Sequence, residues 1–454
     1  MTTASIILAA GLGKRMHSKL PKMLHPLVGK PIILHSLKAV QNLTDLPPVV
    51  VVGHGAEQVQ SVVAEATPGG VKFALQPEQL GTADAVKCAQ SFLEGKADRI
   101  LVTLGDMPLL REETLRQLMS LYQETGCVLT MASIVTDLSR GFGRIIRNEA
   151  GSVVAIVEEA VATPEQLGVN EFNISAYCIN AEWLWSRLLQ IRVSPKGEYY
   201  LTDLVELAVM EGQRVESLVL ADPQEGLGIN DRVDLADAEA AMRKRINTAW
   251  MLAGVTLLEP ATTTIEPDVV IGQDTTIYPN TFLRGTSQIG SDCLIGPNTT
   301  LVNTQVGDHS KIVESVAEYA LVGNGVCIGP YCHLRKGVIL KDHVHMGNFG
   351  EVKESTLDEN VKMGHFSYIG DAHIGANVNI GAGTITCNFD GEKKNFTEIG
   401  ENTFIGSDTM LVAPLKIGKN AKTGAGSVVT HDVPDDTLVL GVPARAKERR
   451  ENCD

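Results

Sequence analysis

The stretch Ile289-Gly290-Ser291-Asp292-Cys293-Leu294-Ile295-Gly296 introduces a pattern that extends through about half of the 454-residue chain. An aliphatic residue recurs every six positions, and a glycine often follows it. The other aliphatic residues of the pattern include Ile271, Ile277, Leu283, Leu301, Ile328, Leu334, Leu340, Met346, Leu357, Met363, Ile369, Ile374, Ile380, Ile399, Ile405, Leu411 and Ile417. This period is the signature of hexapeptide repeats, which wind into a parallel β-helix.

The repeat also explains how such a coil builds a core. One aliphatic side chain per hexad points inward, and small residues beside it let the backbone turn a corner. A β-sandwich would need period-two alternation over strands of about 5–6 residues, which the hexads lack. We therefore expect a prism of stacked coils over residues 253–454. The rhythm breaks near Val313–Leu321 and over Thr386–Thr397, and insertions in a solenoid often carry its binding site.

Residues 1–230 follow a different pattern. Short aliphatic strands at 5–8, 49–52 and 99–104 alternate with helical segments at 32–42, 56–66 and 81–93. The alternation predicts an α/β, doubly wound parallel sheet, in which ligands bind beyond the carboxyl ends of the strands. Residues 11–22, 76–82 and 105–106 would all lie there. Residues 231–252 are charged and rich in Ala, without Gly or Pro, which predicts a connector helix between the two domains.

The composition limits the kinds of partner. A net charge of −15 argues against a general nucleic-acid or anionic membrane surface, because such partners need clustered positive charge. The eight cysteines form no C-x-x-C pair, which favours reduced thiols over a zinc site or a disulfide framework. The apolar run Ile6–Ala10 is too short for a signal peptide or a membrane span. We expect a cytoplasmic protein that binds neither nucleic acid nor membranes.

The first candidate site directly follows the first predicted strand. Its sequence is Leu8-Ala9-Ala10-Gly11-Leu12-Gly13-Lys14-Arg15-Met16, with Pro21-Lys22 shortly after. Glycines allow backbone N–H groups to approach phosphates, and Arg15 and Lys22 add positive charge. A tight turn would explain the glycines alone, but the two cations at the end of a buried strand favour phosphate binding. The stretch matches neither the Walker A nor the Rossmann pattern.

With Gln79-Leu80-Gly81-Thr82 and Leu104-Gly105-Asp106, the first domain resembles the sugar-nucleotide pyrophosphorylases. The resemblance implies that Arg15 and Lys22 are catalytic and that Asp106 and Asn230 hold Mg²⁺. An Asx-turn or a helix cap is the alternative role for Asp106. By the same resemblance, the sugar nucleotide would contact Leu8, Ala9, Ala10, Gly11, Lys22, Gln76, Gly81, Thr82, Leu104, Gly105, Asp106, Gly143, Glu158, Asn173 and Asn230. Lys14 and Asp84 depart from the usual Thr and His of that family.

These residue types suit nucleotidyl transfer. A sugar-1-phosphate oxygen attacks the α-phosphorus of the nucleotide, and pyrophosphate leaves. The protein has to align the reactants and neutralise charge, so a metal, a lysine and an arginine suffice without a protein nucleophile.

The second candidate site interrupts the hexads with His365-Phe366-Ser367-Tyr368-Ile369-Gly370-Asp371, followed by a stretch from Asn379 to Gly391 that reads N-I-G-A-G-T-I-T-C-N-F-D-G. Over essentially the whole chain, the sequence resembles the bifunctional N-acetylglucosamine-1-phosphate uridyltransferase/glucosamine-1-phosphate acetyltransferases. The resemblance implies a left-handed β-helix and a homotrimer. It also implies that His365 is a general base, since a neutral imidazole near pH 7 suits that task. Glu351 would orient it.

The same resemblance assigns two sets of binding residues in the prism. Those for glucosamine-1-phosphate are Arg335, Lys353, Tyr368, Asn379 and Lys394, and those for acetyl-CoA are Ala382, Asn388, Phe389, Ser407, Ala425 and Arg445. Phe389 stands where a Tyr is usual, so a stacking surface remains without the hydroxyl. The basic tail with Lys447, Arg449 and Arg450 is either a partner for coenzyme phosphates or a solvated chain end.

The whole sequence therefore predicts an enzyme with two sites. Acetyl-CoA and glucosamine-1-phosphate would react in the prism, and Mg²⁺-dependent uridylyl transfer from UTP would follow in the α/β domain. The product, UDP-N-acetylglucosamine, serves cell-wall synthesis. One alternative is the same pair of reactions on another sugar or nucleotide. The other is a non-catalytic regulatory homologue, against which the intact Arg15, Lys22, Asp106, Asn230 and His365 argue.

Overall fold

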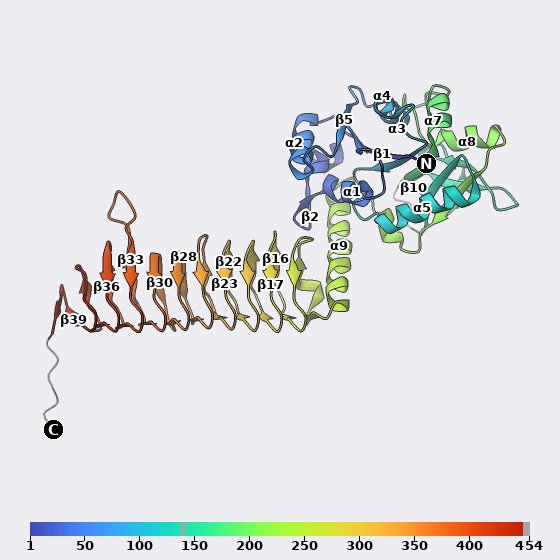
Figure 1. Cartoon of the computed structure of the whole chain (residues 1–454). Helices are drawn as coiled ribbons and strands as arrows, with labels where there is room; N and C mark the ends of the chain where they lie inside the picture. The colour runs from blue at the N-terminus through green and yellow to red at the C-terminus, as the bar shows by residue number, and fades with distance from the viewer. Residues whose placement is uncertain (138–140, 448–454) are drawn as a thin grey trace. The chain divides into compact units, whose positions relative to one another are not determined.

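The computed structural model describes residues 1–137 and 141–447. The chain divides into two compact units, Met1–Met242 and Arg243–Asp454, shown in Figure 1. Helix α9, Arg232–Leu252, runs across the division and has no Gly or Pro. Arg449 and Arg450 of the basic tail lie outside the described residues.

Unit 1 is built on a nine-stranded sheet with the order β11-β7-β10-β6-β1-β4-β5, and β8 pairs with β10 and β9. Its strands are β1 (Thr3–Ala9), β4 (Val49–Val52), β5 (Lys72–Leu75), β6 (Arg99–Leu104), β7 (Leu129–Val135), β8 (Arg144–Arg147), β9 (Val153–Val157), β10 (Glu171–Asn180) and β11 (Val215–Val219). The sheet is mixed and not wholly parallel as predicted, since β10 runs antiparallel to β6 and β7. The chain reaches β10 from the antiparallel pair β8–β9 and not through a parallel crossover, so the strand direction reverses.

Helices cover both faces of this sheet. They are α1 (Ile32–Gln41), α2 (Ala56–Ala66), α3 (Thr82–Cys88), α4 (Gln90–Leu93), α5 (Glu112–Thr125), α6 (Pro164–Leu167), α7 (Ala181–Leu188) and α8 (Asp203–Met210). Neighbouring residues of β1 enter different cores: Ile6 packs with residues of α3, α7 and α8, and Ile7 with residues of α1, α2 and α5. Burial on both faces explains why β4 is a run of four valines. The α/β class is confirmed.

Unit 2 is a β-helix of short strands. They are β12 (Thr256–Leu257), β13 (Thr264–Ile265), β14 (Val270–Ile271), β15 (Thr276–Ile277), β16 (Phe282–Arg284), β17 (Gln288–Ile289), β18 (Leu294–Ile295), β19 (Thr300–Val302), β20 (Gln305–Val306), β21 (Lys311–Ile312), β22 (Val316–Glu318), β23 (Leu321–Val322), β24 (Cys327–Ile328), β25 (His333–Leu334), β26 (Ile339–Leu340), β27 (His345–Met346), β28 (Gly350–Leu357), β29 (Lys362–Met363), β30 (Ser367–Ile374), β31 (Asn379–Ile380), β32 (Ile385–Cys387), β33 (Thr397–Ile399), β34 (Phe404–Ile405), β35 (Met410–Val412), β36 (Leu415–Ile417), β37 (Lys422–Thr423), β38 (Val428–Val429), β39 (Leu438–Gly441) and β40 (Ala444–Ala446).

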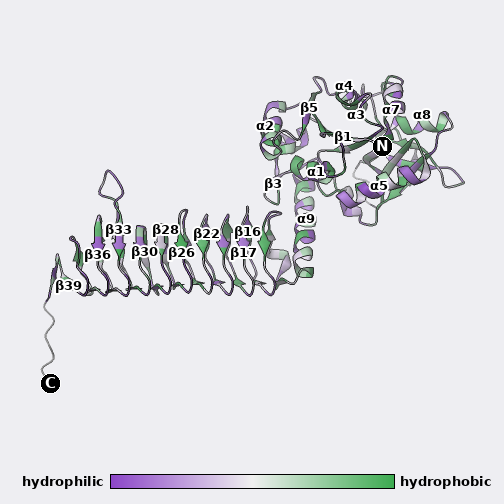
Figure 2. Cartoon of the chain, viewed as in Figure 1, coloured by the Kyte–Doolittle hydropathy of each residue, from purple (hydrophilic) through white to green (hydrophobic). Residues whose placement is uncertain are grey.

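The predicted aliphatic residues form the core of unit 2. Ile277 pairs with Ile295 and Leu283 with Leu301, in parallel register. Ile312, which the six-residue period did not include, joins Ile295 to Ile328 in the same way. These side chains are buried in one continuous cluster that runs the length of the coils. In Figure 2, hydrophobic and hydrophilic residues are interspersed along the whole of unit 2. The stacked coils predicted from the hexads are confirmed, and each coil contributes its own residues to a shared core.

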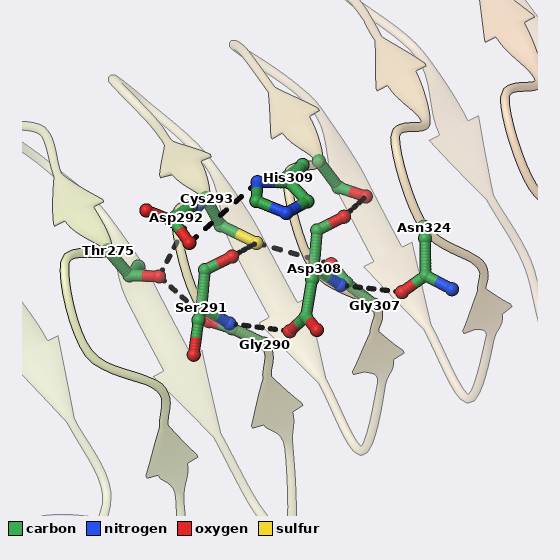
Figure 3. A network of polar contacts seen from close by, with 10 residues as sticks. Thr275, Gly290, Ser291, Asp292, Cys293, Gly307, Asp308, His309 and Asn324 are labelled. Atoms are coloured by element: carbon green, nitrogen blue, oxygen red, sulfur yellow. Dashed lines mark hydrogen bonds and ion pairs between the residues drawn. The ribbon is translucent and has the colours of Figure 1, made fainter.

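Side chains at one corner tie successive coils together, as Figure 3 shows. The Ser291 amide donates to Asp308 Oδ1 at 2.8 Å, and the Asp308 amide donates to Asn324 Oδ1 at 2.9 Å. The Asn324 amide continues the ladder to Asp342 Oδ1 at 2.7 Å. His309, beside Asp308, has a left-handed φ of 57° and is exposed. These corners therefore satisfy their backbone groups with Asp and Asn side chains.

Two features break the regularity of the coils. Strands β28 and β30 are eight residues long, whereas the other strands described in unit 2 have two to four. Asn379 pairs with Phe404, which lies farther along the chain than its partner in a regular coil would. The extra residues form an inserted loop, and a β-bridge between Phe389 and Lys394 closes it. The predicted interruption at residues 386–397 is this loop.

Two further observations concern the described residues only. The seven cysteines among them are free thiols, as the absence of C-x-x-C pairs predicted. No helix among them is both long and apolar enough to cross a bilayer.

Candidate active sites

The glycine-rich loop of unit 1 leaves the end of β1 and forms two single-turn helices, η1 (Lys14–Met16) and η2 (Lys22–Leu24). Gly13 precedes η1 with a left-handed φ of 58°. A Cβ atom at Gly13 would lie 2.8 Å from Cβ of Lys22. The loop therefore needs glycine there, because only glycine allows both the backbone conformation and the close approach of Lys22.

The predicted catalytic cations and the predicted metal ligands lie together. Lys22 Nζ forms an ion pair with Asp106 Oδ2, and Arg15 Nη2 donates to Asn230 Oδ1 at 2.8 Å. The Ile229 amide donates to the Asp106 carbonyl at 2.9 Å, which joins the segment before α9 to the end of β6. Four residues from separate stretches of sequence thus form one polar cluster at the carboxyl ends of the strands.

The oxygens of this cluster are suitable for a divalent metal. A carboxylate and an amide carbonyl are hard donors, and Mg²⁺ is often held by one or two protein groups together with substrate phosphates and water. Among residues 1–137 and 141–447, no group of three or more His, Cys, Asp or Glu side chains could hold a metal. The Asp106 and Asn230 oxygens therefore fit a metal that arrives with phosphates better than one caged by protein alone.

The segment after β5 builds a second wall of this site. The buried Gln76 donates through Nε2 to the Gly81 carbonyl at 3.1 Å and to Asp84 Oδ2 at 2.8 Å. Gly81 has φ 108°, and a Cβ atom there would lie 2.4 Å from the Tyr199 carbonyl oxygen. Asp84, the departure noted in the sequence, thus has a defined partner, since it orients the amide of Gln76.

A cavity of about 190 Å³ lies beside these residues. It is lined by Leu8, Thr82, Val102, Leu104, Glu158, Ser175, Tyr177, Tyr200, Leu201 and Thr202. Thr202 Oγ1 donates to Glu158 Oε1 at 3.2 Å, and burial raises the pKa of Glu158 above its usual value. The Asn173 side chain donates through Nδ2 to Tyr177 Oη at 2.7 Å, and the Asn173 backbone N–H donates to the Gly143 carbonyl at 2.9 Å.

Several lining residues of this cavity were missed by the sequence analysis, namely Ser175, Tyr177, Tyr200 and Thr202. For Ser175 and Tyr177, the indication available in the sequence is that they are polar residues within β10, where a strand buried on both faces would otherwise be aliphatic. Tyr200 and Thr202 lie just before α8 and have no such indication. The predicted Leu8, Thr82, Leu104 and Glu158 all line the cavity, and Asn173 and Gly143 lie next to it through their hydrogen bonds.

In unit 2, residues predicted to bind a sugar phosphate lie on neighbouring coils. The core residues Leu334 and Val352 are paired in register, and the Arg335 amide donates to the Val352 carbonyl at 2.9 Å. Lys353 pairs with Gly370 on the next coil. Arg335 Nη1 also donates to Glu351 Oε1 at 3.1 Å, so the structure gives Glu351 an arginine partner.

Positive charge gathers around Gly370. The adjacent Lys394 ammonium, from the inserted loop, lowers the pKa of Lys353 below its usual value. A Cβ atom at Gly370 would lie 2.4 Å from Tyr368 Oη and 2.8 Å from Asn388 Nδ2. Asn388 in turn donates to Asp371 Oδ2 at 2.5 Å. Two ammonium groups and a guanidinium beside a tyrosine hydroxyl suit a phosphate dianion.

The other predicted residues of unit 2 belong to a different part of the prism. Asn379 lies in the twelve-stranded sheet, whereas β28 and β30 belong to the seventeen-stranded sheet. The Asp408 amide donates to the Ala382 carbonyl at 2.6 Å, which sets Ser407 beside Ala382. A Cβ at Gly406 would meet the Ala425 amide, so Ala425 continues this column. The exposed His365 lies between β29 and β30.

Two predicted coenzyme contacts lie in the inserted loop and near the end of the described chain. Phe389 is exposed on the inserted loop, at the bridge to Lys394. Arg445 lies on β40 and lines a cavity of about 360 Å³ with His431 and Asp432. Phe389 therefore lies next to Lys394 of the cluster around Gly370, whereas Arg445 lies on a separate strand.

Comparison with known proteins defines the class first. The family of MobA-like NTP transferase domains matches residues 5–145, and the bacterial transferase hexapeptide repeat matches residues 268–303 and 396–431. The protein thus joins a nucleotidyltransferase domain to a hexapeptide-repeat transferase.

Relatives over the full length narrow this class. The "Bifunctional protein GlmU" of Exiguobacterium sibiricum is 44% identical over 451 residues, covering 99% of this chain and 98% of the relative. That of Halalkalibacterium halodurans is 43% identical over 445 residues, with 98% and 96% covered. That of Caldanaerobacter subterraneus subsp. tengcongensis is 44% identical over 451 residues, with 99% and 96% covered. The chain belongs to the bifunctional GlmU family.

Membership of this family settles the reaction class. The protein is a bifunctional acetyltransferase and uridyltransferase of UDP-N-acetylglucosamine synthesis, and both units fit these activities. It is an enzyme and not a regulatory homologue. The family also implies a divalent-metal-dependent nucleotide-sugar transferase that acts on small molecules and forms oligomers.

Proposed function

We propose that residues 1–230 carry uridylyl transfer, that residues 231–252 connect the domains, and that residues 253–454 carry acetyl transfer. In the first domain, Arg15 and Lys22 neutralise the triphosphate while a phosphate oxygen of N-acetylglucosamine-1-phosphate attacks the α-phosphorus of UTP and pyrophosphate leaves. The polar cluster of Lys22, Asp106, Arg15 and Asn230 carries this proposal, because it gathers the required charges at one point.

The divalent metal of the first domain is proposed to be Mg²⁺, held by Asp106 and Asn230. When bound, it supplies charge stabilisation on the phosphates. Gly11, Gln76, Gly81 and Thr82 hold the uracil and ribose. The sugar is held by Gly143, Glu158 and Asn173, next to a cavity whose wall includes Glu158. Leu8, Ala9, Ala10, Leu104 and Gly105 complete the contacts with UDP-N-acetylglucosamine.

In the second domain, His365 is proposed to take a proton from the amine of glucosamine-1-phosphate. The amine nitrogen then attacks the thioester carbonyl of acetyl-CoA, the carbon–sulfur bond breaks, and coenzyme A leaves. Arg335, Lys353, Tyr368, Asn379 and Lys394 bind the sugar phosphate. The cationic cluster of Lys353, Lys394 and Arg335 supports this assignment, because it gathers positive charge that a phosphate dianion would neutralise.

The acetyl-CoA groove is proposed to be completed by other copies of this chain in a homotrimer. Arg335, Lys353 and Tyr368 belong to one part of the prism, and the Ala382–Ser407–Ala425 column follows the twelve-stranded sheet. In a homotrimer, the prism of a second copy would place its Ala382–Ser407–Ala425 column beside Arg335, Lys353 and Tyr368 of the first copy. Asn388, Phe389 and Arg445 would then contact the coenzyme from the loop and the final hairpin.

We also propose a cytoplasmic site of action. UTP and acetyl-CoA are cytoplasmic metabolites, and the free thiols of the described residues are compatible with a reducing compartment.

Separating the two activities tests these assignments. The full chain is given glucosamine-1-phosphate, acetyl-CoA, UTP and Mg²⁺, and UDP-N-acetylglucosamine and pyrophosphate are expected. His365→Ala should remove acetyl transfer and leave uridylyl transfer from N-acetylglucosamine-1-phosphate intact, whereas EDTA should do the reverse. His309→Ala, an exposed corner histidine, is the matched control and should keep both activities. Normal acetylation by His365→Ala, or uridylyl transfer that survives EDTA, would contradict the assignments.

A further inference from the structure

One side chain outside the glycine-rich loop is bonded to it. Arg232, the first residue of α9, donates through Nε to the Met16 carbonyl at 3.1 Å. Met16 is the last residue of η1, the turn that contains Arg15. The hydrogen bond therefore connects the beginning of α9 to the turn that carries one of the proposed catalytic cations.

The same guanidinium lies near the second turn of the loop. His25 follows η2 and closes it through a hydrogen bond from its amide to the Lys22 carbonyl at 3.2 Å. Burial of His25 and, as a smaller effect, the positive charge of Arg232 both lower the pKa of the imidazole. Arg232 is thus bonded to the turn of Arg15, and its charge acts on the residue that closes the turn of Lys22.

The turn at η1 needs such support from outside. It is flanked by two residues with left-handed backbone, Gly13 with φ 58° and His17 with φ 46°. Left-handed backbone is unfavourable for a non-glycine residue such as His17 and persists only where surrounding contacts hold it. Arg232 supplies one such contact, and the carbonyl that it holds is the one immediately before His17.

The first part of α9 is also bonded to Asn230 of the site and to a turn that follows the nucleotide loop in the sequence. Asp234 Oδ2 accepts from the Asn230 amide at 2.9 Å, and Asn230 Oδ1 accepts from Arg15 at 2.8 Å. Glu239 Oε2 accepts from the Val28 amide at 2.7 Å, in the turn between β2 (Pro26–Leu27) and β3 (Lys30–Pro31). The beginning of α9 therefore acts as a support to which the nucleotide loop and the proposed metal ligand are both attached.

We infer that Arg232 is a positioning residue for uridylyl transfer: by holding the Met16 carbonyl it fixes the turn that carries Arg15, and thereby sets the affinity of the site for the triphosphate of UTP. The inference rests on the proposed function, because it takes Arg15 to act on the nucleotide. Arg232 itself is given no contact with substrate.

Steady-state kinetics of the full-length chain test this role. Arg232→Ala should raise the KM for UTP about tenfold or more, with a change of no more than about twofold in the KM for N-acetylglucosamine-1-phosphate. Acetyl transfer by the same sample reports whether unit 2 is folded and should stay within about twofold of the wild type, and the KM for N-acetylglucosamine-1-phosphate reports whether unit 1 is folded. Arg232→Lys, which keeps a charged donor near Met16, should recover most of the affinity for UTP. Lys244→Ala removes an exposed cation from the same helix and is the matched control.

The outcomes separate this inference from the proposed function. If the wild-type chain makes no UDP-N-acetylglucosamine, the proposed function fails. If it does and Arg232→Ala keeps a wild-type KM for UTP, the positioning role is wrong. Equal loss of uridylyl transfer and acetyl transfer in Arg232→Ala would also overturn the positioning role. So would an equal rise in the KM for UTP and for N-acetylglucosamine-1-phosphate in both Arg232→Ala and Arg232→Lys, since a general structural role predicts these results.

Discussion

Gly370→Ala should disable acetyl transfer while leaving uridylyl transfer intact. A Cβ atom at this position would lie 2.4 Å from Tyr368 Oη and 2.8 Å from Asn388 Nδ2. Ordinary contact begins near 3.4 Å, so the hydroxyl has to move by about 1.0 Å and the amide by about 0.6 Å, the differences between 3.4 Å and these two distances. The backbone of Gly370 is not left-handed, so the effect comes from this contact and not from backbone strain.

The expected loss follows from that displacement. Misplacement of a binding group by about 1 Å can cost roughly a hundredfold in rate, equivalent to about 2.7 kcal/mol of activation free energy. We therefore expect kcat/KM for glucosamine-1-phosphate to fall about a hundredfold. The assay follows release of the coenzyme A thiol. Uridylyl transfer by the same sample shows that unit 1 is folded, and an unchanged circular dichroism spectrum shows that the β-helix of unit 2 is folded.

Gly364→Ala is the matched control for this variant. It lies in the same prism, its backbone is not left-handed, and a Cβ there would meet no atom within 4 Å. It should keep most of the acetyl transfer activity. A Gly370→Ala enzyme with more than about a third of the wild-type kcat/KM would refute the reasoning, and so would an equal loss in the control.

Two other predictions concern unit 1. Burial, with the charges of Glu206 and Glu158, raises the pKa of Asp203 from 3.8 to about 6. The folded chain thus holds this proton more tightly than the unfolded chain, and the contribution of Asp203 to stability falls as the pH rises from about 3.8 through about 6. Asp203→Asn should therefore raise the free energy of unfolding at pH 8 by about 1–3 kcal/mol more than at pH 4. Urea unfolding at the two pH values measures this difference, and an equal effect at both pH values would contradict the assignment. Asp84→Ala removes the 2.8 Å hydrogen bond that orients Gln76 and should raise the KM for UTP about fivefold, equivalent to about 1 kcal/mol, without affecting acetyl transfer; an unchanged KM would show that Gln76 does not depend on Asp84.

The sequence predicted those parts of the fold that depend on a local period. Ile277, Ile295 and Leu283 were predicted as inward residues of their coils, and the structure pairs Ile277 with Ile295 and Leu283 with Leu301 in register. The valines of β4 and the helix that follows it were found for the same reason. Ile312, which pairs with Ile295, lies off the six-residue period and was not predicted. The antiparallel β10 was not found, because its direction depends on its pairing with β8, which no local pattern contains.

In the candidate sites, too, some contacts follow from the spacing of residues in the sequence and others do not. The stacking of residues on neighbouring coils, such as Lys353 over Gly370, follows from spacing along a regular prism. The hydrogen bonds of Asn388 with Asp371 and of Thr202 with Glu158 do not, because Asn388 lies where the inserted loop interrupts the repeat and Thr202 lies 44 residues from Glu158. Arg232 was missed for the same reason, since its partner Met16 is 216 residues away.

The core of the prism also aligns its candidate site. Leu334, Val352 and Ile369 are fully buried and paired from coil to coil, and Arg335, Lys353 and Gly370 each follow one of them directly. Since one aliphatic side chain per coil fixes the register, the residue after it has its position fixed as well. Coil lengths vary, as the pairs Thr276–Leu294 and Lys311–Cys327 show, yet the inward residues stay aligned because corners absorb the difference. The hexapeptide repeat is therefore not merely a support for the acetyl-transfer site, because the same register that packs its core brings the cationic side chains together.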